Sequence, residues 1–278
     1  MLLRLRGEAQ FDTQRGKVIY KAISKFVRLK DSISKRPPTI LVSINIKSVD
    51  HISPATEAQK LLMNITSLQN EGSMLMKSAE CGAIEHAKLL LFLRDATKMD
   101  SEVQQWRDDC PIDWQAHYCS HIGHTTLSDP QARPYYPRSI SYFQDRFIAG
   151  TWCIVEAARI CLLQTMIECT DVLDLPVIQD AAPFSRSRLD QGILDSVDTI
   201  TSNLPYLLRE IDSNGNLCLP RNSKPFNLLG ILWPLHVFVT VETIDDSSFD
   251  WILRQLRRLA SIIGCQQTIG LRHHEPAL

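Results

Sequence analysis

The chain has 278 residues, 44% of them hydrophobic, which is enough to bury a large core in one or two domains. Thirty basic and 31 acidic side chains give a net charge of −1, so the overall charge does not indicate a polyanion as partner. Residues 1–36 are the exception, with ten Lys and Arg against three acidic residues. This basic segment predicts the solvated face of a helix, or alternatively an arm that makes weak, non-specific contact with nucleic acid.

The amino-terminal third predicts two helices joined by an extended segment. Apolar residues at helical spacing predict a basic helix over residues 11–30, which a later Pro-Pro pair ends. Residues 39–46 are β-branched and alternate locally, which fits either a strand or an extended connection. Ser53, followed by a proline, predicts the start of the next helix, in which Gly72 is a candidate break.

The next part of the chain predicts a further helix and then an irregular region. The helix is expected over residues 79–96 and continues through residues 100–106 until a Cys-Pro pair stops it. Residues 117–138 contain three prolines and are expected to be irregular.

A long apolar helix is predicted over residues 139–173. Its most apolar part, residues 147–167, is the best candidate for a membrane span. Glu156 and Arg159 lie in that part, where charge is costly in lipid, yet they form a natural i, i+3 pair on a helix in water. We therefore predict a core helix and no membrane span.

The carboxyl-terminal part begins with an internal linker loop, predicted over residues 174–188. A helix starts near Leu189, and Pro205 kinks or ends it. Residues 227–239 are apolar almost without interruption, which predicts a helix buried on both sides with His236 as a core histidine.

The last predicted helix is the most regular one. Ser247 is its expected N-cap, Asp250 stands three residues later as in a capping box, and Gly264 closes it. One face carries apolar residues at helical spacing: Phe249, Ile252, Leu253, Leu256, Leu259, Ala260 and Ile263. The chain as a whole is therefore predicted to be one all-α domain over residues 1–278, an irregular bundle of about seven or more helices.

Motifs for catalysis or cofactors are missing. The sequence has no Gly-x-Ser-x-Gly elbow, no Gly-x-Gly-x-x-Gly and no Walker loop. The acidic pairs 108–109 and 245–246 are expected beside helix ends rather than as acid and base. None of the eight cysteines forms a Cys-x-x-Cys pair, and five are predicted to be reduced, core-facing residues of helices: Cys81, Cys153, Cys161, Cys169 and Cys265. We predict no enzyme, no catalytic or cofactor-binding residue and no cofactor.

One segment could bind a metal. His117, His121 and His124 would share a face if residues 117–124 were helical, with Cys110 and Cys119 nearby. The Gly and Thr residues that end the segment oppose a helix, and no standard zinc spacing fits. Surface histidines are the preferred interpretation, so no metal ligand is assigned.

Four stretches in order resemble a known family. They are residues 5–16, residues 100–114 with Trp106 and Trp114, residues 193–207 with Leu204-Pro205-Tyr206, and residues 230–259 with Trp233-Pro234 and Trp251. The chain is similar to the all-helical regulatory region of fungal zinc binuclear cluster transcription factors, the fungal-specific transcription factor domain. The cysteine cluster that holds two zinc ions and reads DNA in that family has no counterpart here, so a truncated or diverged regulator is expected.

The resemblance implies a nuclear protein that influences transcription, often of a secondary-metabolite gene cluster. It implies protein partners, either the transcription machinery or full-length regulators. The alternative function is a small ligand- or metal-binding pathway protein that uses the segment from His117 to His124.

Overall fold

The computed structural model describes residues 53–82, 85–119, 137, 139–173, 184–216, 218 and 225–263, and in the last stretch the side chains of residues 231–259. These residues form six α-helices, a short 3-10 turn and two short strands. The prediction of a mainly helical protein is confirmed, but the predicted count of seven or more helices is not matched. The basic segment 1–36, with its expected helix 11–30, and the segment 39–46 lie outside the described residues.

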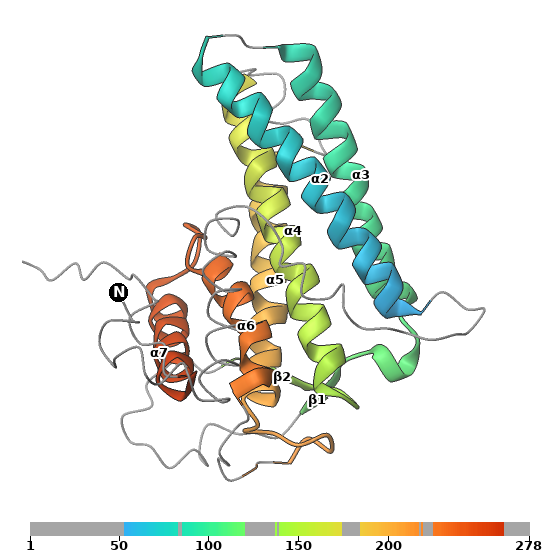
Figure 1. The fold of residues 1–278 in the computed structure, drawn as a ribbon, viewed down its shortest axis with the longest axis vertical. Coiled ribbons are helices and arrows are strands. Elements are labelled where there is room, and N and C mark those ends of the chain that lie inside the picture. Colours follow the sequence, from blue (N-terminus) through green and yellow to red (C-terminus); the bar gives the residue numbers. More distant parts are fainter. Residues whose placement is uncertain are drawn as a thin grey trace, which may run out of the picture.

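The first two described helices form an antiparallel hairpin (Figure 1). Helix α2 (Pro54–Glu80) begins where predicted, and the Ser53 hydroxyl accepts a hydrogen bond from the Thr56 amide at 3.3 Å. Helix α3 (His86–Asp109) begins seven residues later than the predicted position 79, because α2 occupies residues up to Glu80. Gly82, with φ of 81°, then turns the chain.

Gly72 does not break α2, which corrects the sequence prediction. The helix passes through it because its missing side chain allows close packing. A Cβ atom at this position would lie 2.6 Å from Thr165 Cγ2 and 2.9 Å from Phe92 Cζ, both buried atoms of neighbouring helices. The glycine therefore sets how closely α2 approaches α3 and α4.

We expect Gly72→Ala to lower the free energy of unfolding by about 1 kcal/mol. Overpacking typically costs about 1–3 kcal/mol, and it outweighs the gain of about 1 kcal/mol in helix propensity. Gly150→Ala is the matched control, because Gly150 also lies inside a helix and a Cβ there meets nothing within 4 Å. The free energy of unfolding of Gly150→Ala should rise by up to about 1 kcal/mol. Urea denaturation measures both, and equal effects of the two variants would contradict this packing role.

A short antiparallel ladder precedes the central helix. After a 3-10 turn (Ile112–Trp114), β1 (His117–Cys119) pairs with β2 (Ile140–Tyr142) so that His117 lies opposite Tyr142. The prediction of an irregular region is therefore wrong for residues 117–119, which form β1. The prediction of a helix from residue 139 is wrong for the residues before Arg146, which include β2. Helix α4 (Arg146–Leu173) starts only after β2.

Helix α4 is the centre of the molecule. It contacts α2, α3, α5 and α6, and in Figure 1 it runs beside α5 with the α2–α3 hairpin to one side. Every residue from 151 to 160 is buried. The helix is long and apolar enough to cross a membrane, but 78% of its most apolar window is buried inside the protein. Its hydropathy is thus explained by the neighbouring helices.

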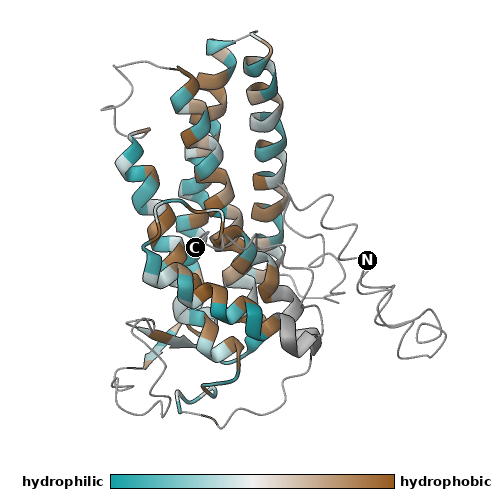
Figure 2. Cartoon of the chain, turned by 90° about the vertical axis from the view of Figure 1, so that its left-hand side faces the viewer, coloured by the Kyte–Doolittle hydropathy of each residue, from teal (hydrophilic) through white to brown (hydrophobic). Residues whose placement is uncertain are grey.

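Three further helices complete the fold. Helix α5 (Arg186–Leu207) starts inside the predicted loop, because the Arg188 and Leu189 amides bond to the Ser185 carbonyl; the loop prediction is wrong for residues 186–188. Pro205 lies in its last turn, as predicted. Helix α6 (Pro225–Phe238) and helix α7 (Asp246–Ile263) pack against each other. Coloured by hydropathy, the helices carry both hydrophobic and hydrophilic residues (Figure 2), and the buried set is mostly hydrophobic.

Asp245, and not the predicted Ser247, caps α7. The Ser247 and Ser248 amides donate to Asp245 Oδ1 at 3.1 and 3.0 Å, and both serine hydroxyls also bond to its carboxylate. These hydrogen bonds lower the pKa of Asp245 to about 2. The predicted capping box with Asp250 is therefore wrong, because the cap lies two residues earlier.

Asp245→Ala should lower the free energy of unfolding at pH 7 by about 1 kcal/mol, the usual value of an N-cap. Since the folded pKa is below the unfolded one, this contribution is present above pH of about 4 and is lost as the pH falls towards 2. Urea denaturation of wild type and Asp245→Ala at pH 7 and at pH 2 measures this contribution. Asp250→Ala, an exposed residue of the same helix, is the control and should show less than half the effect. A difference between wild type and Asp245→Ala that is unchanged at pH 2 would exclude the ionised cap.

Candidate functional site

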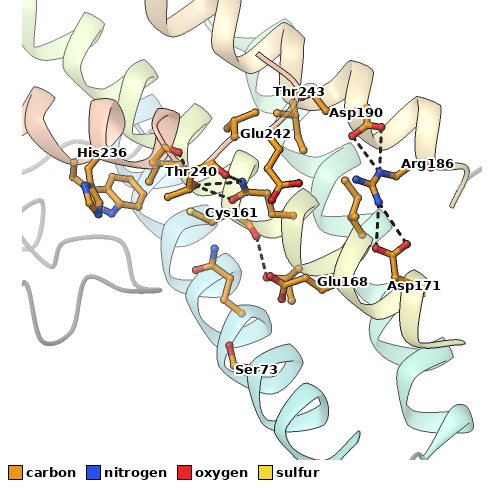
Figure 3. Close-up of a pocket in the computed structure, with 18 residues that line it drawn as sticks. Ser73, Cys161, Glu168, Asp171, Arg186, Asp190, His236, Thr240, Glu242 and Thr243 are labelled. Carbon is orange, nitrogen blue, oxygen red and sulfur yellow. Dashed lines mark hydrogen bonds and ion pairs between the residues drawn. The ribbon is translucent and has the colours of Figure 1, made fainter. Parts of the chain in front are cut away.

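A pocket of about 470 Å³ lies between α2, α4, α5, α6 and the connection from α6 to α7 (Figure 3). This volume is within the usual range for small-molecule sites, about 300–1,000 Å³. Three apolar residues of its lining are almost fully buried, with Trp233 5%, Ile193 2% and Val237 4% exposed, so they offer the cavity little surface. Polar side chains surround this apolar part.

The connection from α6 to α7 is fixed to α4 at the edge of the pocket. Gln164 Nε2 on α4 donates to the Thr240 carbonyl at 3.0 Å and to its hydroxyl at 3.3 Å. The Thr240 hydroxyl also donates to the Val237 carbonyl at 2.7 Å. These bonds hold the following residues, Glu242 and Thr243, in the pocket lining.

The charge of the lining is predominantly negative. Its described residues include four carboxylates, those of Glu168, Asp171, Asp190 and Glu242, and one guanidinium, that of Arg186. Arg186 is shared between two of them, at 3.2 Å from Asp171 Oδ2 and 3.2 Å from Asp190 Oδ2 (Figure 3). Glu168 and Glu242 have no ion pair with any basic side chain of the described residues. The pocket therefore attracts cations.

Gln69 contributes a buried polar group to the same pocket. This residue of α2 is 2% exposed, and its Oε1 has no hydrogen-bond partner among the described residues. A buried acceptor without a partner is uncommon and unfavourable. Because this oxygen is shielded from the pocket by its neighbours, the unmet hydrogen bond is a feature of the packing between α2 and α4.

The cysteine next to Gln69 is not a nucleophile in this setting. Burial raises the pKa of the Cys161 thiol to about 12, so the thiol stays protonated near neutral pH. Burial has the same effect on Cys153 and Cys169, each with a pKa of about 12. The prediction of core-facing cysteines is confirmed for Cys153 and Cys169, and Cys161 is partly buried and packs against the core. The prediction is wrong for Cys81, which is exposed, and Cys265 lies outside the described residues.

A second cavity, of about 520 Å³, lies between α3, α4 and α5 beside a buried ion network. Arg159 is 2% exposed, and its Nε lies 2.6 Å from Asp100 Oδ1 on α3. Glu156, fully buried, lies 3.9 Å from Arg159 Nη1 and 3.3 Å from Arg107 Nε. Although burial opposes the charge, the hydrogen bond and charge of Asp100 raise the pKa of Arg159. Asp100 and Arg159 neutralise each other at the edge of this cavity, which favours a structural role. Both carboxylate oxygens of Glu156 lack a hydrogen-bond partner among the described residues.

The predicted pair Glu156–Arg159 is confirmed, but its partners on α3 were not predicted. Asp100 is 59 positions from Arg159 in the sequence, so only the tertiary fold brings them together.

The acidic residues of the first pocket were also missed, although the sequence holds a signal for some of them. Gln164, Glu168 and Asp171 recur at i, i+4 and i+7 in an otherwise apolar helix, which places them on one face. Glu242 carries no such signal, because it lies between two helices.

The candidate residues named from the sequence do not form a site. His117 is exposed on β1, and His121 and His124 lie outside the described residues, so the metal hypothesis remains a prediction. Within the described part of the chain, no three His, Cys, Asp or Glu side chains are grouped to hold a metal ion. His236 is exposed in the lining of the first pocket, which corrects its prediction as a core residue.

The two acidic pairs differ in position. Asp245 and Asp246 begin α7, as predicted for a helix start. Asp108 and Asp109 lie in the last turn of α3, where the helix dipole does not stabilise a carboxylate, so the dipole interpretation is wrong for them.

Comparisons with protein-family models, with curated proteins and with solved structures give no match to this chain.

Proposed function

We propose that the protein is a transcription factor-like regulatory module that acts in the nucleus through protein contacts and influences a fungal secondary-metabolite gene cluster. The proposal depends on the four ordered stretches that resemble the fungal-specific transcription factor domain. What supports it in the structure is the place of the three stretches that lie among the described residues: Trp106, Tyr206, Trp233 and Trp251 are all buried in helices. A mainly helical fold of this kind agrees with the family's all-helical regulatory region.

The buried cysteines have strongly raised pKa values. Four of the described cysteines, including Cys110, have a pKa of about 12 through burial. A thiol that stays protonated is neither a good nucleophile nor a good metal ligand. These four cysteines are therefore not candidates for a nucleophile or a metal ligand.

The experiment is to express the tagged full-length chain in a fungal host, separate nuclei from cytosol and identify the proteins that co-purify. We expect the chain in the nuclear fraction together with a transcription regulator. A cytosolic protein with no chromatin-associated partner would contradict the proposal. Deleting the gene should also change the transcripts of its genomic neighbours, and unchanged transcripts would count against it.

Contact with nucleic acid through residues 1–36 is a separate proposal. Binding by a basic segment is electrostatic, so its affinity should fall steeply as salt rises. A mobility-shift assay at low salt tests it, and no retention there would exclude it.

A further inference from the structure

We infer that the turn of residues 212–216, which follows α5, is a modification site at which Asn214 loses its side-chain amide spontaneously and becomes aspartate or isoaspartate. This inference goes beyond the proposed regulatory function and does not depend on it. Asn214 is the one asparagine of the sequence that a glycine follows. Because glycine has no side chain, its backbone nitrogen can approach the preceding side chain with the least steric resistance.

The reaction needs no reagent other than water. The Gly215 backbone nitrogen attacks the side-chain carbonyl carbon of Asn214, Cγ, and forms a bond to it. The amide nitrogen of Asn214 leaves as ammonia and takes the proton that the Gly215 nitrogen loses. Water then opens the cyclic imide at either carbonyl. Opening at Cγ gives aspartate, and opening at the backbone carbonyl gives isoaspartate, in which the chain runs through the side-chain carbons of residue 214.

The structure leaves the reacting side chain accessible. Asn214 is exposed, and its side chain forms no hydrogen bond within the described residues; its backbone N–H donates to Asp212 Oδ1 at 2.8 Å. Asn216, in the same turn, is followed by leucine, and its side chain is bonded to Asp212 Oδ2 at 3.4 Å. The other described asparagines lie inside helices, where the fixed backbone opposes ring closure: Asn64, Asn70, Asn203 and Asn227.

One hydrogen bond of the turn opposes the reaction. The Gly215 N–H donates to the Asp212 carbonyl at 3.2 Å, which is at the long end of the normal range. The nitrogen must leave this bond before it can attack Asn214. Exposed turns open locally at a low cost, and a single hydrogen bond adds little to it. The turn should therefore slow the reaction by about tenfold or less compared with an unfolded peptide.

Isoaspartate does not fit the turn, whereas aspartate does. The Asp212 N–H donates to the Asn216 carbonyl at 2.9 Å, and Asp212 Oδ1 accepts from the Asn216 N–H at 2.9 Å. These bonds suit one length of chain between the two residues, and isoaspartate lengthens that chain by a methylene group. Its formation also displaces Gly215, whose carbonyl accepts a hydrogen bond from Cys119 Sγ on β1 at 3.4 Å. Aspartate keeps the length, so only isoaspartate should open the turn.

The test is to keep the full-length protein in neutral buffer and to follow its peptides by mass spectrometry, beside a synthetic peptide of residues 208–218. We expect Asn214 to lose its amide at a rate no more than about tenfold below that of the peptide. Asn64, which is exposed but lies in α2, is the internal control and should keep its amide. Labelling with protein isoaspartyl methyltransferase identifies isoaspartate. An Asn214 that keeps its amide while the peptide is converted, or equal rates at Asn214 and Asn64, would overturn the inference.

Two variants separate the reaction from its effect on the turn. Asn214→Gln should keep its amide under the same conditions, because its longer side chain would have to close a larger ring. Freshly prepared Asn214→Asp reproduces the aspartyl product. We expect hydrogen exchange of the Asn216 and Cys218 amides, which are bonded to Asp212 and Glu210, to become faster in the isoaspartyl protein and to stay slow in both variants. Loss of the amide from Asn214→Gln at the wild-type rate would exclude ring closure, and unchanged exchange in the isoaspartyl protein would contradict the opening of the turn.

Discussion

Arg159→Met should lower the free energy of unfolding by about 3–5 kcal/mol, the typical effect of removing one partner from a buried ion pair. The side chain is 3% exposed and is bonded to Asp100, Ser196 and the Gly192 carbonyl. Methionine has a similar length but no charge, so the variant leaves Asp100 without its cation and Glu156 with Arg107 alone. Urea denaturation at pH 7 measures the loss.

Arg186→Met is the matched control for Arg159→Met. Arg186 also pairs with two carboxylates, but its side chain is 50% exposed. Exposed pairs of this kind contribute about 0–1 kcal/mol, because water already screens the charges. An equal effect of the two substitutions would show that burial does not determine the strength of the network.

The double variant Glu156→Leu with Arg159→Met tests the cause of the loss. If the penalty comes from the fully buried Glu156, which then keeps Arg107 as its one cation, removing that carboxylate should restore at least half of the lost stability. Glu156 is fully buried, and Arg107, which is 27% exposed, can turn towards water once Glu156 is absent. A double variant no more stable than Arg159→Met would contradict this explanation. Its stability can be measured even if Arg159→Met alone does not fold.

Elements with a strong local pattern could be predicted from the sequence. Helix α2 was found from the cap at Ser53, and α7 from its apolar stripe, because caps and helical spacing act within a few residues. The predicted helix boundaries were wrong where a contact between distant parts of the sequence determines them. The strands β1 and β2 contain three residues each and exist only as a pair, so residues 139–145 looked like the start of α4.

The candidate site could not be predicted, because it has no local pattern. Gln69, Glu168 and Glu242 are separated by 99 and then 74 positions, and they line one pocket only through the packing of α2, α4 and the connection after α6. Gly72 illustrates the same limit: a glycine in a helix looks like a break until the neighbours that need its small size are known. His236 looked buried for a related reason, since it follows a run of residues that are all buried.

Trp106→Ala should also lower the free energy of unfolding by about 3–5 kcal/mol, as large-to-small changes of buried aromatic residues do. Trp106 is 5% exposed at the end of α3, and its ring lies 5.2 Å from that of Trp152 on α4. Its Nε1 donates to the Pro54 carbonyl at 3.1 Å, which joins the end of α3 to the start of α2. The change therefore removes packing between three helices. Thermal and urea denaturation measure it.

Two further variants separate the contributions of Trp106. Trp106→Phe keeps an aromatic ring but loses the hydrogen bond to the Pro54 carbonyl, so its free energy of unfolding should fall by about 1–2 kcal/mol. Tyr118→Ala, at an aromatic residue that is 66% exposed, is the control and should change stability by less than about 0.5 kcal/mol. Trp106 belongs to one of the stretches that resemble the transcription factor domain, and its burial gives that stretch a structural role. If Trp106→Ala lost the nuclear partners while keeping wild-type stability, the stretch would instead be a contact surface.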